Sequence, residues 1–245
     1  MRFFDCNCSF GKGPLPAFKY ARDAAELADE MDFCGIDRAL VYAAGMRFGS
    51  PTTWNSLVVA EAKRYPALEP TWAILPPQTG EMPYGPELLD TMKANGVRAL
   101  RAFPDEHRYR LDRRTFADVF DALIEKRIPL FVKQNLVAIG DLLAEVPDLV
   151  VVAVNQGPHS LERYLRPLIE SYPNLYVDTS YYIVDGLIEE FCERYGPERL
   201  LFGSAYPDNC SGAALLRLIQ ADIDAQGKSA IAGGNLERLL GEVRL

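Results

Sequence analysis

Short apolar runs alternate with stretches of helical periodicity along the whole chain. The runs "LVVVAV", "ALVYAA" and "LFV" are continuously apolar, which is typical of parallel strands buried on both faces. Between such runs, apolar residues recur at helical spacing, and the first such stretch ends on Gly35, a residue type that favours a helix C-cap. Strands are expected near 2–7, 37–43, 70–75, 97–102, 128–133, 149–154, 175–179 and 200–203. Helices are expected over 21–35, 55–66, 85–96, 112–127, 136–146, 160–173, 184–196 and 211–226, with a last short helix at 234–243.

This order predicts the fold class α/β, with eight strand–helix units and no break in composition. It favours one (β/α)8 TIM barrel domain over residues 1–245, and the alternative is an open sheet of six or seven strands. The loops 43–54 and 75–86 follow the second and third strands, so a barrel places them at its C-terminal face, where active sites are built.

Composition narrows the classes of function. The 245 residues carry a net charge of −8, which argues against a nucleic-acid or anionic-membrane surface. No apolar run reaches the ~18 residues of a membrane span, and the N-terminus lacks the apolar core of a signal peptide. Five cysteines are an odd number and indicate reduced thiols, so a cytoplasmic protein is expected.

The N-terminal stretch "FFDCNCSFG" is the first candidate for chemistry. If Asp5, Asn7 and Ser9 point into the barrel, the alternation of a strand turns Cys6 and Cys8 outward toward the helices. There they act as small hydrophobic side chains. A metal role or a redox role for the two thiols is the alternative.

Four stretches resemble the amidohydrolase-related family, the metal-dependent barrels of the amidohydrolase 2 type. "FFDCNCSFG" lies where the family has Asp-x-His-x-His, and "NSLVVAEAKRYP" is similar to its Asn-led helix ending in Tyr-Pro. "PERLLFGSAYP" and "GGNLERLLG" are similar to the family's eighth strand and closing helix. The resemblance covers residues 3–241 and implies a (β/α)8 hydrolase or decarboxylase.

The positions that the resemblance assigns to metal ligands carry other residues. The family's histidines fall on Asn7, Ser9, Lys133 and Asn155, and its strand-eight aspartate falls on Ala205. Asn, Ser and Ala cannot replace imidazole or carboxylate ligands, and a lysine cation repels a metal ion. No metal and no cofactor is therefore expected.

Lys133 is expected at the centre of the barrel mouth, between Asn7, Ser9 and Asn155. A buried lysine there requires a carboxylate partner, for which Asp5 and Asp178 are the candidates. Anion binding, or covalent chemistry with a lowered pKa, is the alternative for Lys133. Lys133, Asp5 and Asp178 are the catalytic candidates.

Further polar residues are expected at strand ends and form the candidate binding set. Arg101 is a forked cation suited to a substrate carboxylate, with a salt bridge at the rim as its alternative. The other candidate binding residues are Asn7, Ser9, Asn155, Ser180 and Tyr206. The histidines are expected elsewhere: His107 in a solvated loop and His159 at a helix start.

Two functions follow from this pattern. One is a metal-independent hydrolase, similar to a lactonase, or a lyase that acts on a small anionic substrate. The other is a catalytically inactive pseudoenzyme with a binding or assembly role, either as a homo-oligomer or beside an active relative.

Overall fold

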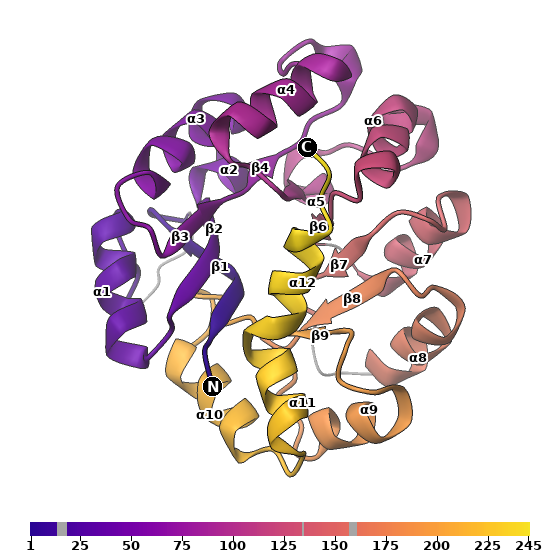
Figure 1. Ribbon diagram of the computed structural model, residues 1–245. Helices are drawn as coiled ribbons and strands as arrows, with labels where there is room; N and C mark the ends of the chain where they lie inside the picture. The colour runs from indigo at the N-terminus through magenta and orange to yellow at the C-terminus, as the bar shows by residue number, and fades with distance from the viewer. Residues whose placement is uncertain (14–18, 134, 157–160) are drawn as a thin grey trace.

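The computed structural model of the protein describes residues 1–13, 19–133, 135–156 and 161–245. Nine parallel strand segments form a ring that is surrounded by helices (Figure 1). The strands are β1 (Phe4–Phe10), β2 (Arg38–Ala43), β3 (Leu68–Pro70), β4 (Trp72–Ala73), β5 (Leu100–Ala102), β6 (Leu130–Val132), β7 (Val151–Ala153), β8 (Leu175–Asp178) and β9 (Leu200–Leu201).

Two features show that these nine segments form a closed barrel of eight strands. Thr71 separates β3 from β4, and its amide donates to Val41 O of β2 (3.0 Å), so the two segments occupy one strand position. The ring closes where Cys6 N of β1 donates to Phe202 O (2.9 Å), directly after β9. The predicted (β/α)8 barrel is confirmed, and each predicted strand overlaps an observed one.

The helices follow the strands in chain order. The outer ring consists of α1 (Ala24–Cys34), α3 (Pro51–Ala62), α4 (Pro86–Asn95), α6 (Arg113–Lys126), α7 (Leu136–Glu145), α8 (Leu161–Ser171), α9 (Leu187–Tyr195) and α10 (Ser211–Gln220). Shorter pieces are α2 (Gly45–Phe48), η1 (Pro77–Thr79), α5 (Pro104–His107), α11 (Ala225–Ser229), η2 (Ala230–Gly234) and α12 (Asn235–Gly241). The end of α1 follows its residue type, since Gly35 adopts φ 81° and closes the helix.

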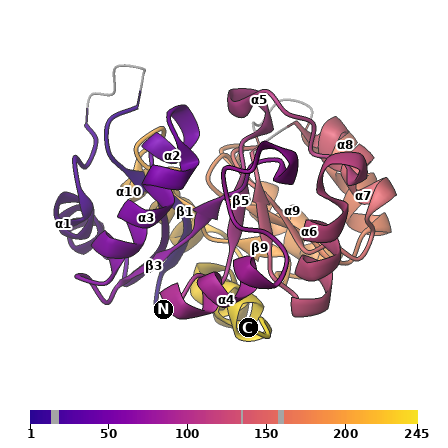
Figure 2. The ribbon, with the colours of Figure 1, turned by 90° about the horizontal axis from the view of Figure 1, so that it is seen from above.

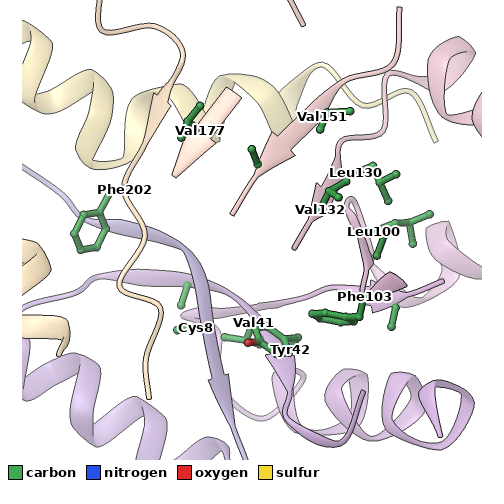
Figure 3. Packing of buried hydrophobic residues seen from close by; sticks show 14 of the residues in the cluster. Cys8, Val41, Tyr42, Leu100, Phe103, Leu130, Val132, Val151, Val177 and Phe202 are labelled. Carbon is green, nitrogen blue, oxygen red and sulfur yellow. The ribbon is translucent and has the colours of Figure 1, made fainter. Parts of the chain in front are cut away.

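Alternate residues of each strand build two separate cores. Outward side chains such as Leu130, Val132 and Val151 pack under the helices (Figure 3). Inward side chains such as Phe131 and Val152 form a smaller cluster that fills the barrel together with leucines of α12. This two-faced burial explains the continuously apolar strands.

Helix α12 closes the N-terminal end of the barrel. Figure 1 shows it crossing the centre of the ring, and the Arg98 guanidinium, just before β5, donates to Leu240 O of α12 (3.4 Å). Figure 2 shows α2 and α5 at the opposite end of the molecule. The C-terminal end of the barrel is therefore covered by loops and these two short helices, and functional side chains are expected there.

A bulge in β1 changes which way its side chains point. Asp5 pairs with Ala39 and Cys8 pairs with Val41, so β1 has one residue more than β2 over this interval. Cys6 consequently belongs to the inner cluster and Cys8 to the outer one. The expectation that both thiols point outward is confirmed for Cys8 and wrong for Cys6, because strand alternation does not hold across a bulge.

All five cysteines are free thiols in the structure. Over the described ranges of the chain, no helix has both the length and the apolar content that crossing a membrane requires.

Candidate functional site

The side-chain amide of Asn7 is the point where four strands meet at the C-terminal face. Its Nδ2 donates to Asn155 Oδ1 (2.6 Å) and to Asp178 Oδ2 (2.8 Å). Its Oδ1 accepts from Arg101 Nη1 (3.3 Å). The amide thus presents its oxygen to a cation and its NH2 group to a carboxylate.

Arg101 lies inside the barrel instead of at its rim, with 1% of its surface exposed. Its Nε donates to Thr71 Oγ1 (2.9 Å), and Nη2 donates to the carbonyls of Cys6 (2.8 Å) and Leu40 (3.2 Å). The rim salt bridge considered from the sequence is wrong, because no carboxylate of the described residues lies within ion-pair distance of this guanidinium. A buried cation is held here by neutral oxygen acceptors alone.

Two aromatic rings enclose the same guanidinium. Its carbon lies 4.6 Å from the ring centre of Tyr42 and 4.9 Å from that of Phe131. Cation–π contacts of this kind stabilise a desolvated guanidinium and fix its plane. The orientation of Arg101 is therefore set before any ligand arrives.

Asp178, at the end of β8, is the carboxyl group of this network. Its Oδ1 accepts from Asn155 N (3.1 Å), and its Oδ2 accepts from Ser180 Oγ (2.7 Å) as well as from Asn7. Burial raises the pKa of Asp178 from 3.8 to about 6, against the lowering effect of these hydrogen bonds. The nearby Asp5 carboxyl raises this pKa further.

Asp5 has a different position in the fold from the one its motif suggests. Its Oδ1 accepts from Asn7 N (2.9 Å) and Ser204 N (3.0 Å), which ties β1 to the segment after β9. Burial raises the pKa of Asp5 as well. Asp5 therefore secures the barrel closure beneath Asn7.

Strained backbone marks the same place. Asn155 has φ 57° and Ala205 has φ 53°, and the other two non-glycine residues with positive φ in the described chain are helix C-caps. Both contact Asn7, since Ala205 N donates to Asn7 O (2.8 Å). Strain of this kind clusters at functional sites, because the surrounding structure must maintain it.

Lys133 does not occupy the centre of the mouth. Its Nζ pairs with Glu106 Oε1 of α5 (2.9 Å), so the predicted pairing with Asp5 or Asp178 is wrong. The guanidinium of Arg101 lies beside Asn7 in its place, because a side chain from β5 reaches the barrel axis there. Lys133 follows β6 and extends to the rim.

The rim around Lys133 is a charged network that sequence reasoning missed. Arg47 of α2 donates to Glu106 Oε1 (2.5 Å) and to Asp208 Oδ2 (3.0 Å). Two cations therefore share one oxygen of Glu106, and they lower the pKa of its carboxyl despite its burial. The sequence signal for Arg47 was its position in the 43–54 loop.

The remaining candidates differ in how they relate to the Asn7 network. Ser180 joins the network through Asp178, and Ser9 donates its main-chain NH to Tyr206 O (2.9 Å). The Tyr206 side chain instead lines a cavity of about 300 Å³ against α1, so its expected place in the mouth is wrong. His107 is half-buried on α5, and desolvation lowers its pKa, which corrects the expectation of a solvated loop. The candidate His159 lies outside the described residues.

The donor set at this face does not fit a catalytic metal ion. In the part of the chain that the structure describes, no three His, Cys, Asp or Glu side chains gather at metal-binding distance. The oxygens of Asn7 and Asn155 accept hydrogen bonds from Arg101 and Asn7, and a guanidinium repels a divalent ion.

Comparison with known proteins supplies the family. A model of the amidohydrolase family matches residues 5–241. Among solved structures, an uncharacterised TIM-barrel protein from Bordetella bronchiseptica is 18% identical, with a TM-score of 0.76 and 99% of both chains covered. The 5-carboxyvanillate decarboxylase from Sphingomonas paucimobilis is 15% identical, with a TM-score of 0.73 and 99% of both chains covered. A putative 2-pyrone-4,6-dicarboxylic acid hydrolase from Pseudomonas putida is 16% identical, with a TM-score of 0.72 and 98% of both chains covered. A search of curated proteins found no match.

Proposed function

This chain belongs to the amidohydrolase family, and from that premise we propose that it is a metal-independent hydrolase or lyase acting on a small carboxylic acid. The observation that carries the proposal is Asp178, a buried carboxyl group at the C-terminal end of a barrel strand with a pKa of about 6. A group of this pKa can both donate and accept a proton near neutral pH.

The buried guanidinium of Arg101 supports an acidic substrate. A guanidinium has five N–H donors, and four hydrogen bonds are described for Arg101. The remaining donor belongs to Nη1, the nitrogen that faces Asn7. At the rim, Arg47 and Lys133 pair with Glu106, and Arg47 also pairs with Asp208, so the two cations there are balanced by two carboxylates.

These features assign separate roles in the proposed reaction. Arg101 binds the carboxylate of the substrate through its remaining N–H. Asp178 donates a proton to the bound substrate or accepts one from it. Asn7, Asn155 and Ser180 hold the carboxyl group of Asp178 in place. Lys133 and Arg47 together hold the Glu106 carboxylate at the rim. The similar solved structures include a decarboxylase and a hydrolase named for small carboxylic acids, which agrees with this substrate class.

A binding barrel without catalysis is the second candidate. It is favoured by one observation: both oxygens of Asp178 accept internal hydrogen bonds, and 1% of the residue is exposed. In that case the network is a structural polar core, and the mouth binds an acid without converting it.

The test uses the full chain after treatment with a chelator. A panel of lactones, pyrone carboxylic acids and hydroxybenzoic acids is assayed for turnover and, in parallel, for an upward shift of the melting temperature. Turnover that Asp178→Asn lowers by at least about a hundredfold, within the range of general acid–base catalysis, supports the enzyme. Asp141→Asn, on the exposed face of α7, is the matched control and should retain full activity.

Two other outcomes contradict the proposal. Stabilisation by an acid without any turnover favours the binding barrel. Turnover that appears only after a divalent metal is restored overturns the metal-independent function.

A further inference from the structure

The polar centre of the barrel contains a cation and an acid joined by one amide. Arg101 Nη1 donates to Asn7 Oδ1, and Asn7 Nδ2 donates to Asp178 Oδ2. The amide dipole matches the charges on both sides. Through these two hydrogen bonds, the positive charge of Arg101 and the negative charge of an ionised Asp178 stabilise each other.

We propose that Arg101, acting through the Asn7 amide, supplies to Asp178 the positive charge that a divalent ion supplies in a metal-dependent barrel. Arg101 is then a positioning residue for the ionisation of Asp178, in addition to its role in ligand binding. The inference concerns the site of the proposed function, but it holds for the chain without ligand.

A guanidinium is well suited to this task. Burial lowers the pKa of the Arg101 guanidinium, but a guanidinium keeps its proton in proteins, so the charge is permanent at neutral pH. Thr71 and the Cys6 carbonyl hold it at 2.9 and 2.8 Å, and the rings of Tyr42 and Phe131 cover its faces. The positive charge is therefore fixed in position, as a bound ion would be.

Other groups also face Asp178, and the test must separate them from Arg101. Asp5 and Cys6 approach it from β1, and Tyr181 and Tyr182 approach it from the segment after β8. All four disfavour its ionisation when they carry negative charge themselves. Arg217 of α10 is a second cation nearby, and it donates to the main-chain carbonyls of Thr179 (3.0 Å) and Ser180 (3.2 Å). Arg101 differs from it because a single side-chain amide, that of Asn7, joins its guanidinium to the carboxyl group of Asp178.

The experiment measures the titration of Asp178 in the chelator-treated chain without ligand. The carboxyl carbons of aspartate are labelled with 13C, and the Asp178 signal is assigned by its loss in Asp178→Asn. Arg101→Gln removes the charge but keeps amide donors for the neighbouring carbonyls. Arg101→Lys keeps the charge. Asn7→Leu breaks the connection while the guanidinium stays.

The expected result is a higher titration midpoint for Asp178 in Arg101→Gln, by about one pH unit, because a nearby cation favours the carboxylate. Arg101→Lys should restore most of the wild-type midpoint. Asn7→Leu should raise the midpoint, and adding Arg101→Gln to it should change little more. A merely structural role for Arg101 lowers stability without these shifts.

Two results overturn the proposal. One is an Asp178 midpoint that is the same in Arg101→Gln and the wild type. The other is stoichiometric uptake of Zn²⁺ or Mn²⁺ by the wild-type chain, measured by elemental analysis, with a change in the Asp178 signal. If the Arg101→Gln chain does not fold, Arg101→Met, which removes the charge but keeps an unbranched side chain, decides, and an unchanged midpoint there overturns the proposal. Asn7→Leu alone does not decide, because it also removes a direct hydrogen bond to Asp178.

These outcomes are independent of turnover. If the chain shows the shifts in the Asp178 midpoint but converts no acid, only the proposed function is contradicted. If the chain converts an acid but shows no shift in the Asp178 midpoint, only the inference about Arg101 is contradicted.

Discussion

Replacing Asp178 with asparagine should make the chain more stable relative to the wild type as the pH rises. Replacing a salt-bridged aspartate has the opposite effect. The pKa of Asp178 rises from 3.8 to about 6 on folding because its carboxyl group is buried. A difference of about two pH units at about 1.4 kcal/mol each corresponds to about 3 kcal/mol. The folded chain holds this proton more tightly, so the stabilisation is complete below the unfolded pKa and is lost as pH rises through about 6.

The asparagine variant cannot ionise and does not lose this stabilisation. It does lose part of the hydrogen bonding, because one oxygen becomes an NH2 group facing the Asn155 N–H or the Asn7 NH2 group. That loss is about 1–3 kcal/mol and does not depend on pH. Relative to the wild type, Asp178→Asn should therefore gain about 2 kcal/mol of stability between about pH 4.5 and 8.

Urea denaturation at a series of pH values measures this difference directly. The free energy of unfolding of Asp178→Asn is compared with the wild type, and the Asp141→Asn chain corrects for the loss of one surface charge. A difference between Asp178→Asn and the wild type that stays constant from pH 4.5 to 8 would show that Asp178 is ionised in the folded chain at both ends. The assignment of Asp178 as a proton-transferring group would then be wrong.

Three further predictions concern the rest of the molecule. A Cβ atom at Gly45 would lie 1.9 Å from the Trp54 ring, so Gly45→Ala should destabilise the chain by about 1–3 kcal/mol in urea denaturation, whereas Gly212→Ala, which meets nothing within 4 Å, should not. Lys133→Met should cost about 1 kcal/mol or less in the same assay, because Glu106 keeps its second cation; a loss of several kcal/mol would indicate a buried pair at the barrel centre. In a thiol titration, both cysteines of β1 should stay unreactive in the native chain, and all five should react after unfolding without reductant; a total of three would indicate a disulfide.

The fold could be predicted from the sequence because each local signal agreed with the barrel. The apolar runs at 128–133 and 149–154 became β6 and β7, and Gly35 and Gly96 close the helices before β2 and β5 in the left-handed conformation. The third predicted strand is interrupted at Thr71, but its two segments, β3 and β4, still occupy one place in the barrel. Local patterns of this kind depend only on neighbours along the chain.

The site could be predicted only in part. Asn7, Asn155, Asp178 and Ser180 were expected at strand ends, and the structure brings them into one network. Lys133 was expected at the centre and lies at the rim, because the position of a residue at a strand end does not fix how far its side chain reaches. Arg47 and Glu106 lie 59 positions apart and meet through the packing of α2 and α5.

The sequence by itself determined the order of strands and helices and the polar residue types at the strand ends, because periodicity and residue chemistry are local properties. It favoured a closed barrel over an open sheet, and the contact of β1 with the segment after β9 decides for closure. The tertiary structure decided which cation occupies the barrel interior. Arg101 reaches Asn7 because a bulge after Asp5 turns the Cys6 carbonyl and the Asn7 amide toward it, and because Tyr42 and Phe131 enclose the guanidinium. Such an arrangement depends on the register between strands and on side-chain packing, which no single stretch of sequence specifies.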